Sequence, residues 1–144
     1  MSMEHNHTQF AALTAPARPS ATVTHLRCRE VMRLDYEPVE HIFASKGAHE
    51  AEEMVCRVLE DIAYKLDALQ CANAAHSFDA ILKPARRIVT VGTQIGLTDV
   101  IEAAAHVTHC AKQGDGVALS ATLARLERAF DVAVTQVWRY REGH

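Results

Sequence analysis

Hydrophobic residues recur every three or four positions from residue 35 almost to the C-terminus, with polar residues between them. This period is that of an amphipathic α-helix with one buried face. Gly, Pro and polar clusters divide the pattern into a short helix over 36–44 and four longer helices. Short turns between long helices favour antiparallel neighbours. The sequence therefore predicts an all-α fold, an up-down antiparallel four-helix bundle over residues 35–144 with a short lead-in helix.

The boundaries of the first two helices follow from local signals. Asp35 is a good N-cap for the short helix, and Pro38 suits its first turn. A turn is expected at 45–47, before a long helix that ends near Cys71 and is followed by a turn over 73–77. The buried stripe of this long helix is expected to comprise Met54, Val55, Val58, Leu59, Ile62, Leu66 and Leu69.

The next helix is expected over 78–93, with a kink or restart at Pro84 and a left-handed Gly96 at its end. Its buried stripe is predicted to contain Ile81, Ala85, Ile88, Val91 or Gly92, and Ile95. A fourth segment begins near Thr98, with a stripe formed by Val100, Ile101, Ala104, Val107 and Cys110. The Gly-Asp-Gly break at 114–116 precedes the last helix, whose stripe is Leu119, Leu123, Leu126, Phe130, Val134 and Val137.

Residues 1–34 lack this periodicity and contain Pro16 and Pro19, which would break a helix. We expect a flexible tail to about residue 24 and a strand-like or helical lead-in over 25–34. His5 and His7 have the spacing of half a metal site, but no partner ligands accompany them. The predicted organisation is thus a tail and lead-in over 1–34, then one helical domain over 35–144.

Composition narrows the class of protein. Apolar residues make up 49% and charged residues 23%, and the formal net charge of −3 argues against a dedicated nucleic-acid binder. No signal peptide is visible, and no apolar stretch nears the roughly 20 residues that span a bilayer. The four cysteines form no CxxC motif, and three fall in apolar helical patterns, so reduced core thiols in a cytoplasmic protein are expected.

Three sequence elements occur in a set order between residues 69 and 130: AAHSFDAI at 74–81, QIGL at 94–97 and AKQGD at 111–115. In this order they resemble the turn and helix start, the Asn-x-Gly-Ala element and the Gly-Asp break of histidine phosphotransfer (Hpt) domains. DYEP at 35–38 is similar to the short lead-in helix of that family. The resemblance implies a four-helix bundle that relays phosphoryl groups between receiver domains in bacterial phosphorelays.

The sequence departs from the family at the reactive position. The resemblance places the phosphoacceptor histidine ten residues before Gly96, where this chain has Arg86. The Lys and Gly that the family carries just after the histidine are replaced by Val89 and Thr90. A guanidinium remains protonated and has no free lone pair with which to attack an acyl phosphate. The sequence therefore predicts no catalytic residue at this site and no enzymatic activity.

The residues around Arg86 indicate binding instead. Lys83, Arg86 and Arg87 place three positive charges on one helical face, and Thr90 and Gln94 continue that face. Such a face can simply be solvated, but the resemblance places it where a receiver domain presents clustered carboxylates. Arginine forms charge-assisted bidentate hydrogen bonds with carboxylates and phosphates. The first hypothesis is a non-catalytic Hpt-like protein that binds a receiver or histidine-kinase domain through these five residues.

Two alternatives remain open. One is an active phosphotransfer protein that uses a non-standard histidine, His106 or His109; the other is a structural module that forms a homodimer near Trp138 and Tyr140. His106, His109 and Cys110 share a helix face, as metal ligands can, but no second ligand pair matches them. No metal, cofactor, nucleic acid or membrane is expected as a ligand.

Overall fold

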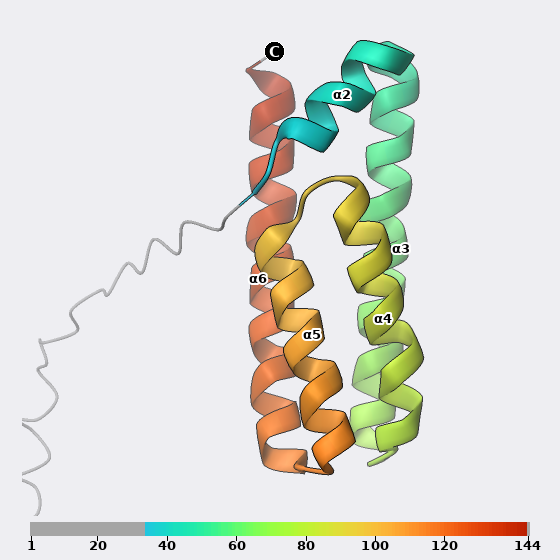
Figure 1. Ribbon diagram of the computed structural model, residues 1–144, viewed down its shortest axis with the longest axis vertical. Helices are drawn as coiled ribbons and strands as arrows, with labels where there is room; N and C mark the ends of the chain where they lie inside the picture. The colour runs from blue at the N-terminus through green and yellow to red at the C-terminus, as the bar shows by residue number, and fades with distance from the viewer. Residues whose placement is uncertain (1–33, 144) are drawn as a thin grey trace, which may run out of the picture. The chain divides into compact units, whose positions relative to one another are not determined.

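The computed structural model describes residues 34–143, and within this range the secondary structure is entirely helical (Figure 1). The helices are α2 (Glu37–Lys46), α3 (Ala48–Ala74), α4 (Phe78–Gln94), α5 (Thr98–Gln113) and α6 (Gly116–Glu142). The predicted all-α class is confirmed. The expected flexible tail, and the lead-in apart from Leu34, lie outside the described residues, as does Cys28.

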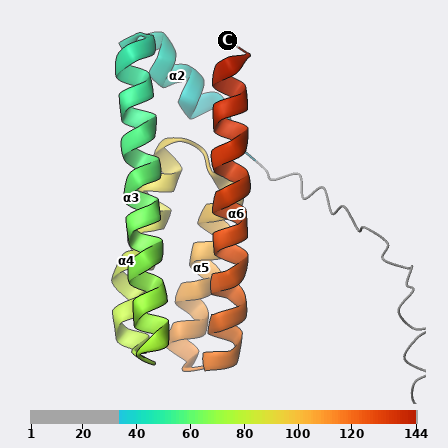
Figure 2. The same cartoon turned by 180° about the vertical axis from the view of Figure 1, so that it is seen from behind.

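Each long helix packs against the next along the chain, and α6 also contacts α3. Consecutive long helices run in opposite directions (Figures 1 and 2). α3 and α6 have 27 residues each, whereas α4 has 17 and α5 has 16, so α3 and α6 extend past the turn that joins α4 to α5. α2 lies above that turn and spans from α6 to α3 on the side of α4 and α5.

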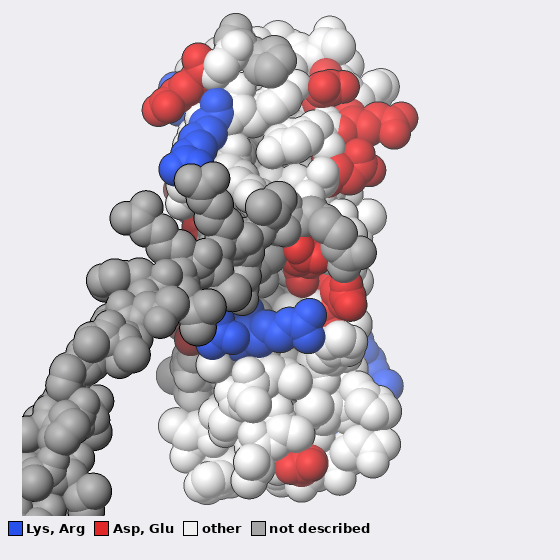
Figure 3. All heavy atoms as spheres, turned by 90° about the vertical axis from the view of Figure 1, so that its left-hand side faces the viewer, with Lys and Arg blue, Asp and Glu red and all other residues white. Residues whose placement is uncertain are grey.

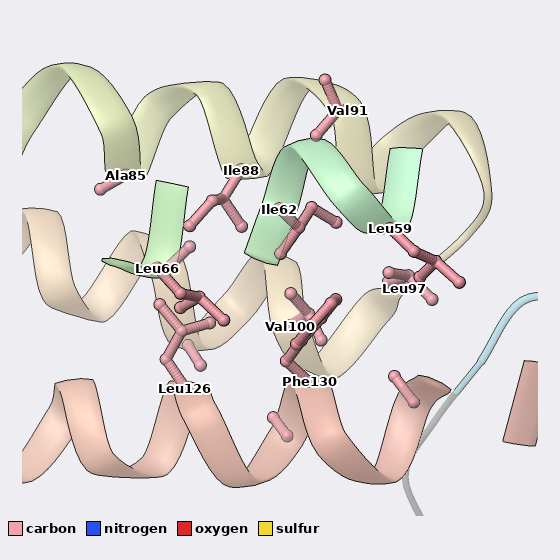
Figure 4. Close-up of a cluster of buried hydrophobic side chains, with 14 of the residues drawn as sticks. Leu59, Ile62, Leu66, Ala85, Ile88, Val91, Leu97, Val100, Leu126 and Phe130 are labelled. Atoms are coloured by element: carbon pink, nitrogen blue, oxygen red, sulfur yellow. The ribbon is translucent and has the colours of Figure 1, made fainter. Parts of the chain in front are cut away.

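The core is built from the apolar stripes that periodicity predicts. Figure 4 shows side chains from α3, α4, the α4–α5 turn, α5 and α6 pointing toward one another, among them Ile62, Ile88, Leu97 and Leu126. Burial of one such side chain contributes roughly 1.5–3 kcal/mol to folding. The whole predicted stripe of α4 is buried, whereas four predicted core residues of the other helices are only half-buried: Met54, Ile101, Cys110 and Val134.

Several predicted boundaries are wrong by a few residues. α2 begins at Glu37 and continues through Lys46, because only Gly47, with φ of 83°, leaves the helix. Tyr36, not Asp35, occupies the N-cap position, although the Asp35 carboxylate accepts a hydrogen bond from the Glu37 amide at 3.1 Å. α3 continues to Ala74 because Ala72 is buried and extends the apolar stripe beyond Cys71.

Two further predictions are wrong in part. α4 is continuous through Pro84, so the predicted restart is absent, and its neighbours Ile81, Ala85 and Ile88 are fully buried. Proline there removes one backbone hydrogen bond and leaves the rest of the helix intact. The three described cysteines are free, as predicted, but they are not core thiols: Cys56 and Cys110 are half-buried, and Cys71 is exposed.

Gly96 joins the start of the described chain to the end of α4. Its φ of 73° is the predicted left-handed conformation, which glycine adopts without steric cost. Its carbonyl accepts a hydrogen bond from the Asp35 amide at 2.9 Å. A Cβ atom at this position would lie 1.9 Å from the Asp35 carbonyl oxygen, so the contact has room only for glycine.

The C-terminal end of α6 is attached to α2 and α3 through aromatic and charged side chains. The rings of Tyr36 and Tyr140 stack with centroids 4.8 Å apart, and the Tyr140 hydroxyl donates to Glu40 Oε1 at 3.4 Å. Arg141 Nε binds Glu52 Oε1 at 2.9 Å, and its guanidinium lies over the ring of Trp138. Trp138 and Tyr140, which the sequence suggested as a dimer surface, are therefore engaged within the protein.

Gly96→Ala is expected to lower the free energy of unfolding by about 3 kcal/mol, because the left-handed backbone and the contact with Asp35 both exclude a methyl group. Gly114→Ala is the matched control: Gly114 has φ of 69°, but nothing lies within 4 Å of the position that a Cβ would take, so a loss of only about 1 kcal/mol is expected. Urea denaturation followed by circular dichroism measures both. Equal losses in the two variants would show that the Asp35 contact is unimportant.

Partial desolvation, followed by the negative charge of Glu40, raises the pKa of Tyr140 above its usual value of 10.0. A raised pKa in the folded state means that the stability from this hydroxyl is present below pH 10 and is lost as pH rises through the folded pKa. Tyr140→Phe should therefore unfold more easily than wild type at pH 8, by a margin that shrinks at pH 11. Tyr64→Phe, at an exposed site, is the control and should unfold as wild type does at pH 8 in the same urea titrations.

Candidate functional site

The five residues predicted to bind a partner lie on the exposed face of α4. Lys83, Arg86, Arg87, Thr90 and Gln94 are all exposed, while the opposite face of the helix is buried against α3 and α5. Steps of three or four residues, from Lys83 to Arg86 or Arg87 and on to Thr90 and Gln94, place them along one side of the helix. The predicted exposure of this basic face is confirmed.

A second helix contributes to the same surface. Lys65 and Ala68 of α3 line a groove of about 420 Å³ together with Lys83, Pro84, Arg86, Arg87 and Thr90 of α4. We call Lys65, Lys83, Arg86 and Arg87 the basic patch; Ala68 and Pro84 supply its apolar floor. The sequence did not predict Lys65 as part of this surface. The amphipathic pattern shows which face of α3 is buried, but it does not show which edge of that face meets α4.

Part of the patch is already paired within the protein. Asp61 Oδ2 lies 3.1 Å from both Nε and Nη2 of Arg87, and Asp61 Oδ1 lies 3.8 Å from Lys65 Nζ. Within residues 34–143, no carboxylate lies within ion-pairing distance of Lys83 or Arg86. The unpaired positive charge of the patch is therefore concentrated at the end that Lys83 and Arg86 form.

Thr90 and Gln94, the other two predicted residues, lie further along α4 than Lys83 and Arg86. Gln94 lines a separate groove of about 500 Å³ between α3 and α4, which contains both acidic and basic side chains. Arg87 and Asp61 both border this second groove, and Arg87 lines the first groove as well. The Thr90 hydroxyl donates to the Arg86 carbonyl at 3.1 Å and so is used within α4. The structure thus groups Lys83, Arg86 and Arg87 closely and separates Gln94 from Lys83.

An exposed aromatic side chain borders the patch. Tyr64 is 72% exposed and lies one helical turn from Asp61 and from Ala68 on α3, with Lys65 Nζ 5.4 Å from its ring centroid. Tyrosine is enriched at protein interfaces, because its ring is apolar and its hydroxyl can hydrogen-bond. The surface around the patch thus combines positive charge with apolar area, as a protein-binding surface does.

Figure 3 shows a different charge pattern on the α6 side of the described helices, away from α3 and α4. Acidic side chains gather along one edge there, and basic side chains occur in small separate groups.

The candidate histidines His76, His106 and His109 lie outside α4. His76 is in the turn between α3 and α4, with φ of 53°, and His106 and His109 are exposed on α5. His106 Nδ1 lies 3.3 Å from Arg125 Nη1. A guanidinium only donates, so Nδ1 is the acceptor in this contact, and the hydrogen of the neutral ring is then on Nε2. The described residues contain no cluster of three His, Cys, Asp or Glu side chains that could hold a metal ion.

Comparison of the chain with protein-family models, with curated proteins and with solved structures gave no match in any of the three. None of the described helices combines the length and apolar content needed to cross a membrane.

Proposed function

We propose that this protein is a non-catalytic, Hpt-like signalling protein that binds a receiver domain, or a histidine-kinase domain, through the basic patch. The observation that supports this most is the position of Lys83 and Arg86. They are exposed on one face of α4, they lie in a groove with an apolar floor, and no carboxylate within residues 34–143 pairs with them. An acidic surface on a partner protein would supply the carboxylates that Lys83 and Arg86 lack within residues 34–143.

The chemistry of the patch suits carboxylate recognition. The guanidinium of Arg86 can bind a carboxylate through two parallel hydrogen bonds, and the ammonium of Lys83, one turn away, can bind a second. Complementary charge also accelerates the encounter between two proteins. Because the protonated guanidinium of Arg86 has no free lone pair with which to attack phosphorus, the expected outcome of contact is a complex and not phosphoryl transfer.

The arrangement of the helices is compatible with this proposal. We propose an up-down antiparallel four-helix bundle of the Hpt type over residues 35–144, in which α2 is the lead-in helix and α4 carries Arg86 where the family has its reactive histidine. The order of α2, the long α3, the Gly96 turn and the Gly114 break agrees with the sequence elements that resemble the family. We also expect a cytoplasmic location, as for a partner of receiver domains.

The two alternatives have less support. The hydrogen bond between His106 and Arg125 disfavours His106 as a phosphoacceptor. A homodimer through Trp138 and Tyr140 would need side chains that already contact Arg141, Tyr36 and Glu40.

Isothermal titration calorimetry against receiver and histidine-kinase domains of the same organism tests the proposal, with and without an acyl-phosphate mimic on the receivers. At least one domain should bind, and Lys83→Glu with Arg86→Glu should weaken that binding at least about tenfold. The matched control, Lys112→Glu with Arg128→Glu, changes the net charge equally at exposed positions on α5 and α6 and should bind as wild type does. No binding to any domain, or equal weakening in both double variants, would contradict the proposal.

A radiolabelled phosphoryl group on the bound receiver separates binding from catalysis. We expect no label to appear on this protein after incubation. Label that appears and is then lost in His106→Ala or His109→Ala would instead establish the phosphotransfer alternative.

A further inference from the structure

We propose that Asp61 is an internal competitor of the acidic partner and thereby sets the affinity of the basic patch. Asp61 already forms ion pairs with Lys65 and Arg87, two of the four cations that the partner's carboxylates would bind. This inference rests on the proposed function only in taking the patch as the binding surface, and it makes Asp61 a specificity-determining residue for that surface.

The geometry places the Asp61 carboxylate between the two cations. Oδ2 faces the guanidinium edge of Arg87, with both Nε and Nη2 at 3.1 Å, while Oδ1 faces Lys65 Nζ at 3.8 Å. The Asp61 side chain is 26% exposed and that of Arg87 is 51% exposed. The carboxylate therefore lies deeper in the seam between α3 and α4, and the guanidinium that it binds remains accessible from outside.

No other acidic side chain of residues 34–143 has this position. Among these residues, the groove at the basic patch is lined by Lys65, Lys83, Arg86 and Arg87 together with apolar residues and Thr90, and by no carboxylate. Asp61 borders the patch from the neighbouring groove, where Glu50 and Glu53 also lie, but no ion pair joins either of those to the four patch cations. Within residues 34–143, Asp61 is thus the one carboxylate that forms an ion pair with the patch.

Two effects on a partner follow from this position. A carboxylate that approaches Arg87 must share or replace the contact with Asp61, and it meets the like charge of Asp61 at short range. Lys83 and Arg86 have no such competitor within the described chain, so an acidic segment should bind there first. A partner with several clustered carboxylates can then compete for Arg87 and Lys65, whereas a partner with a single carboxylate cannot.

Asp61→Asn separates charge from shape. The asparagine side chain has nearly the same size, and its carbonyl oxygen can still accept a hydrogen bond from Arg87, but the negative charge is lost. Asp67→Asn is the matched control, because it removes the same charge from an exposed position on the same helix, six residues further along α3, where no contact with the patch is present.

The probe is a hexaglutamate peptide, so that the measurement does not depend on finding the natural partner. Titration followed by amide chemical shifts should give a dissociation constant about fivefold lower for Asp61→Asn than for wild type, with the largest shifts around Lys83 and Arg86. The gain should shrink as salt is raised from about 50 mM to about 500 mM, because screening weakens exposed charge interactions. Asp67→Asn should bind the peptide as wild type does.

The outcomes separate this inference from the proposed function. Equal dissociation constants for wild type and Asp61→Asn, an equal gain in Asp67→Asn, or no detectable binding by either protein would overturn the role of Asp61. A fivefold gain for hexaglutamate, with no receiver or kinase domain bound, would support the role of Asp61 and contradict the proposed partner. Circular dichroism of both variants checks that the fold is unchanged.

Discussion

Burial of one face of α4 between α3 and α5 is the constraint from which the candidate site follows. Ile81, Ala85 and Ile88 are fully buried, and each contacts the rest of the core from the same side of the helix. With 3.6 residues per turn, this fixes Lys83, Arg86 and Arg87 on the opposite, solvent side. These three side chains stay on the solvent side without an ion-pair partner, because the buried apolar stripe fixes the rotation of α4 about its axis. The free energy that orients the site thus comes from the core and not from the site itself.

The second constraint is the close approach of the chain at Gly96. The turn after α4 has to receive the Asp35 backbone, and the hydrogen bond between the two places α2 directly above the α4–α5 turn. Tyr36 and Glu40 then reach Tyr140 on α6. One glycine thereby connects the end of the helix that carries the patch with the packing of α2 and the C-terminal end of α6. The patch itself is distant from these contacts along α4, so its surface can be altered without disturbing them.

Much of this arrangement could be predicted from periodicity, and its failures have physical causes. The buried stripe and exposed cations of α4 were predicted correctly because one helix determines both. Asp61 and Lys65 could not be predicted as part of the site, since their contribution depends on how α3 is rotated against α4, and amphipathicity leaves both edges of a buried face equivalent. The end of α3 was placed too early because Ala72 is a weak apolar signal, although its side chain is buried. The cysteines were assigned to the core because three of the four occur in apolar patterns, but all three described side chains lie at the margin of the buried stripe or outside it.

The pairing of Asp61 with Arg87 has different consequences for folding and for binding. An ion pair between half-exposed side chains contributes only about 0.2–1 kcal/mol to folding, because solvent screens the attraction and both side chains lose conformational freedom. The negative charge of Asp61 also repels every acidic group that approaches Arg87 or Lys65. We therefore expect its effect on the affinity for a partner to grow with the number of carboxylates that the partner brings to these two residues. The stability that Asp61 supplies is thus small compared with that of one buried isoleucine of α4. By contrast, its single negative charge offsets one of the four positive charges of the basic patch. For the proposed acidic partner, we therefore expect Asp61 to affect recognition much more than it affects the stability of the fold.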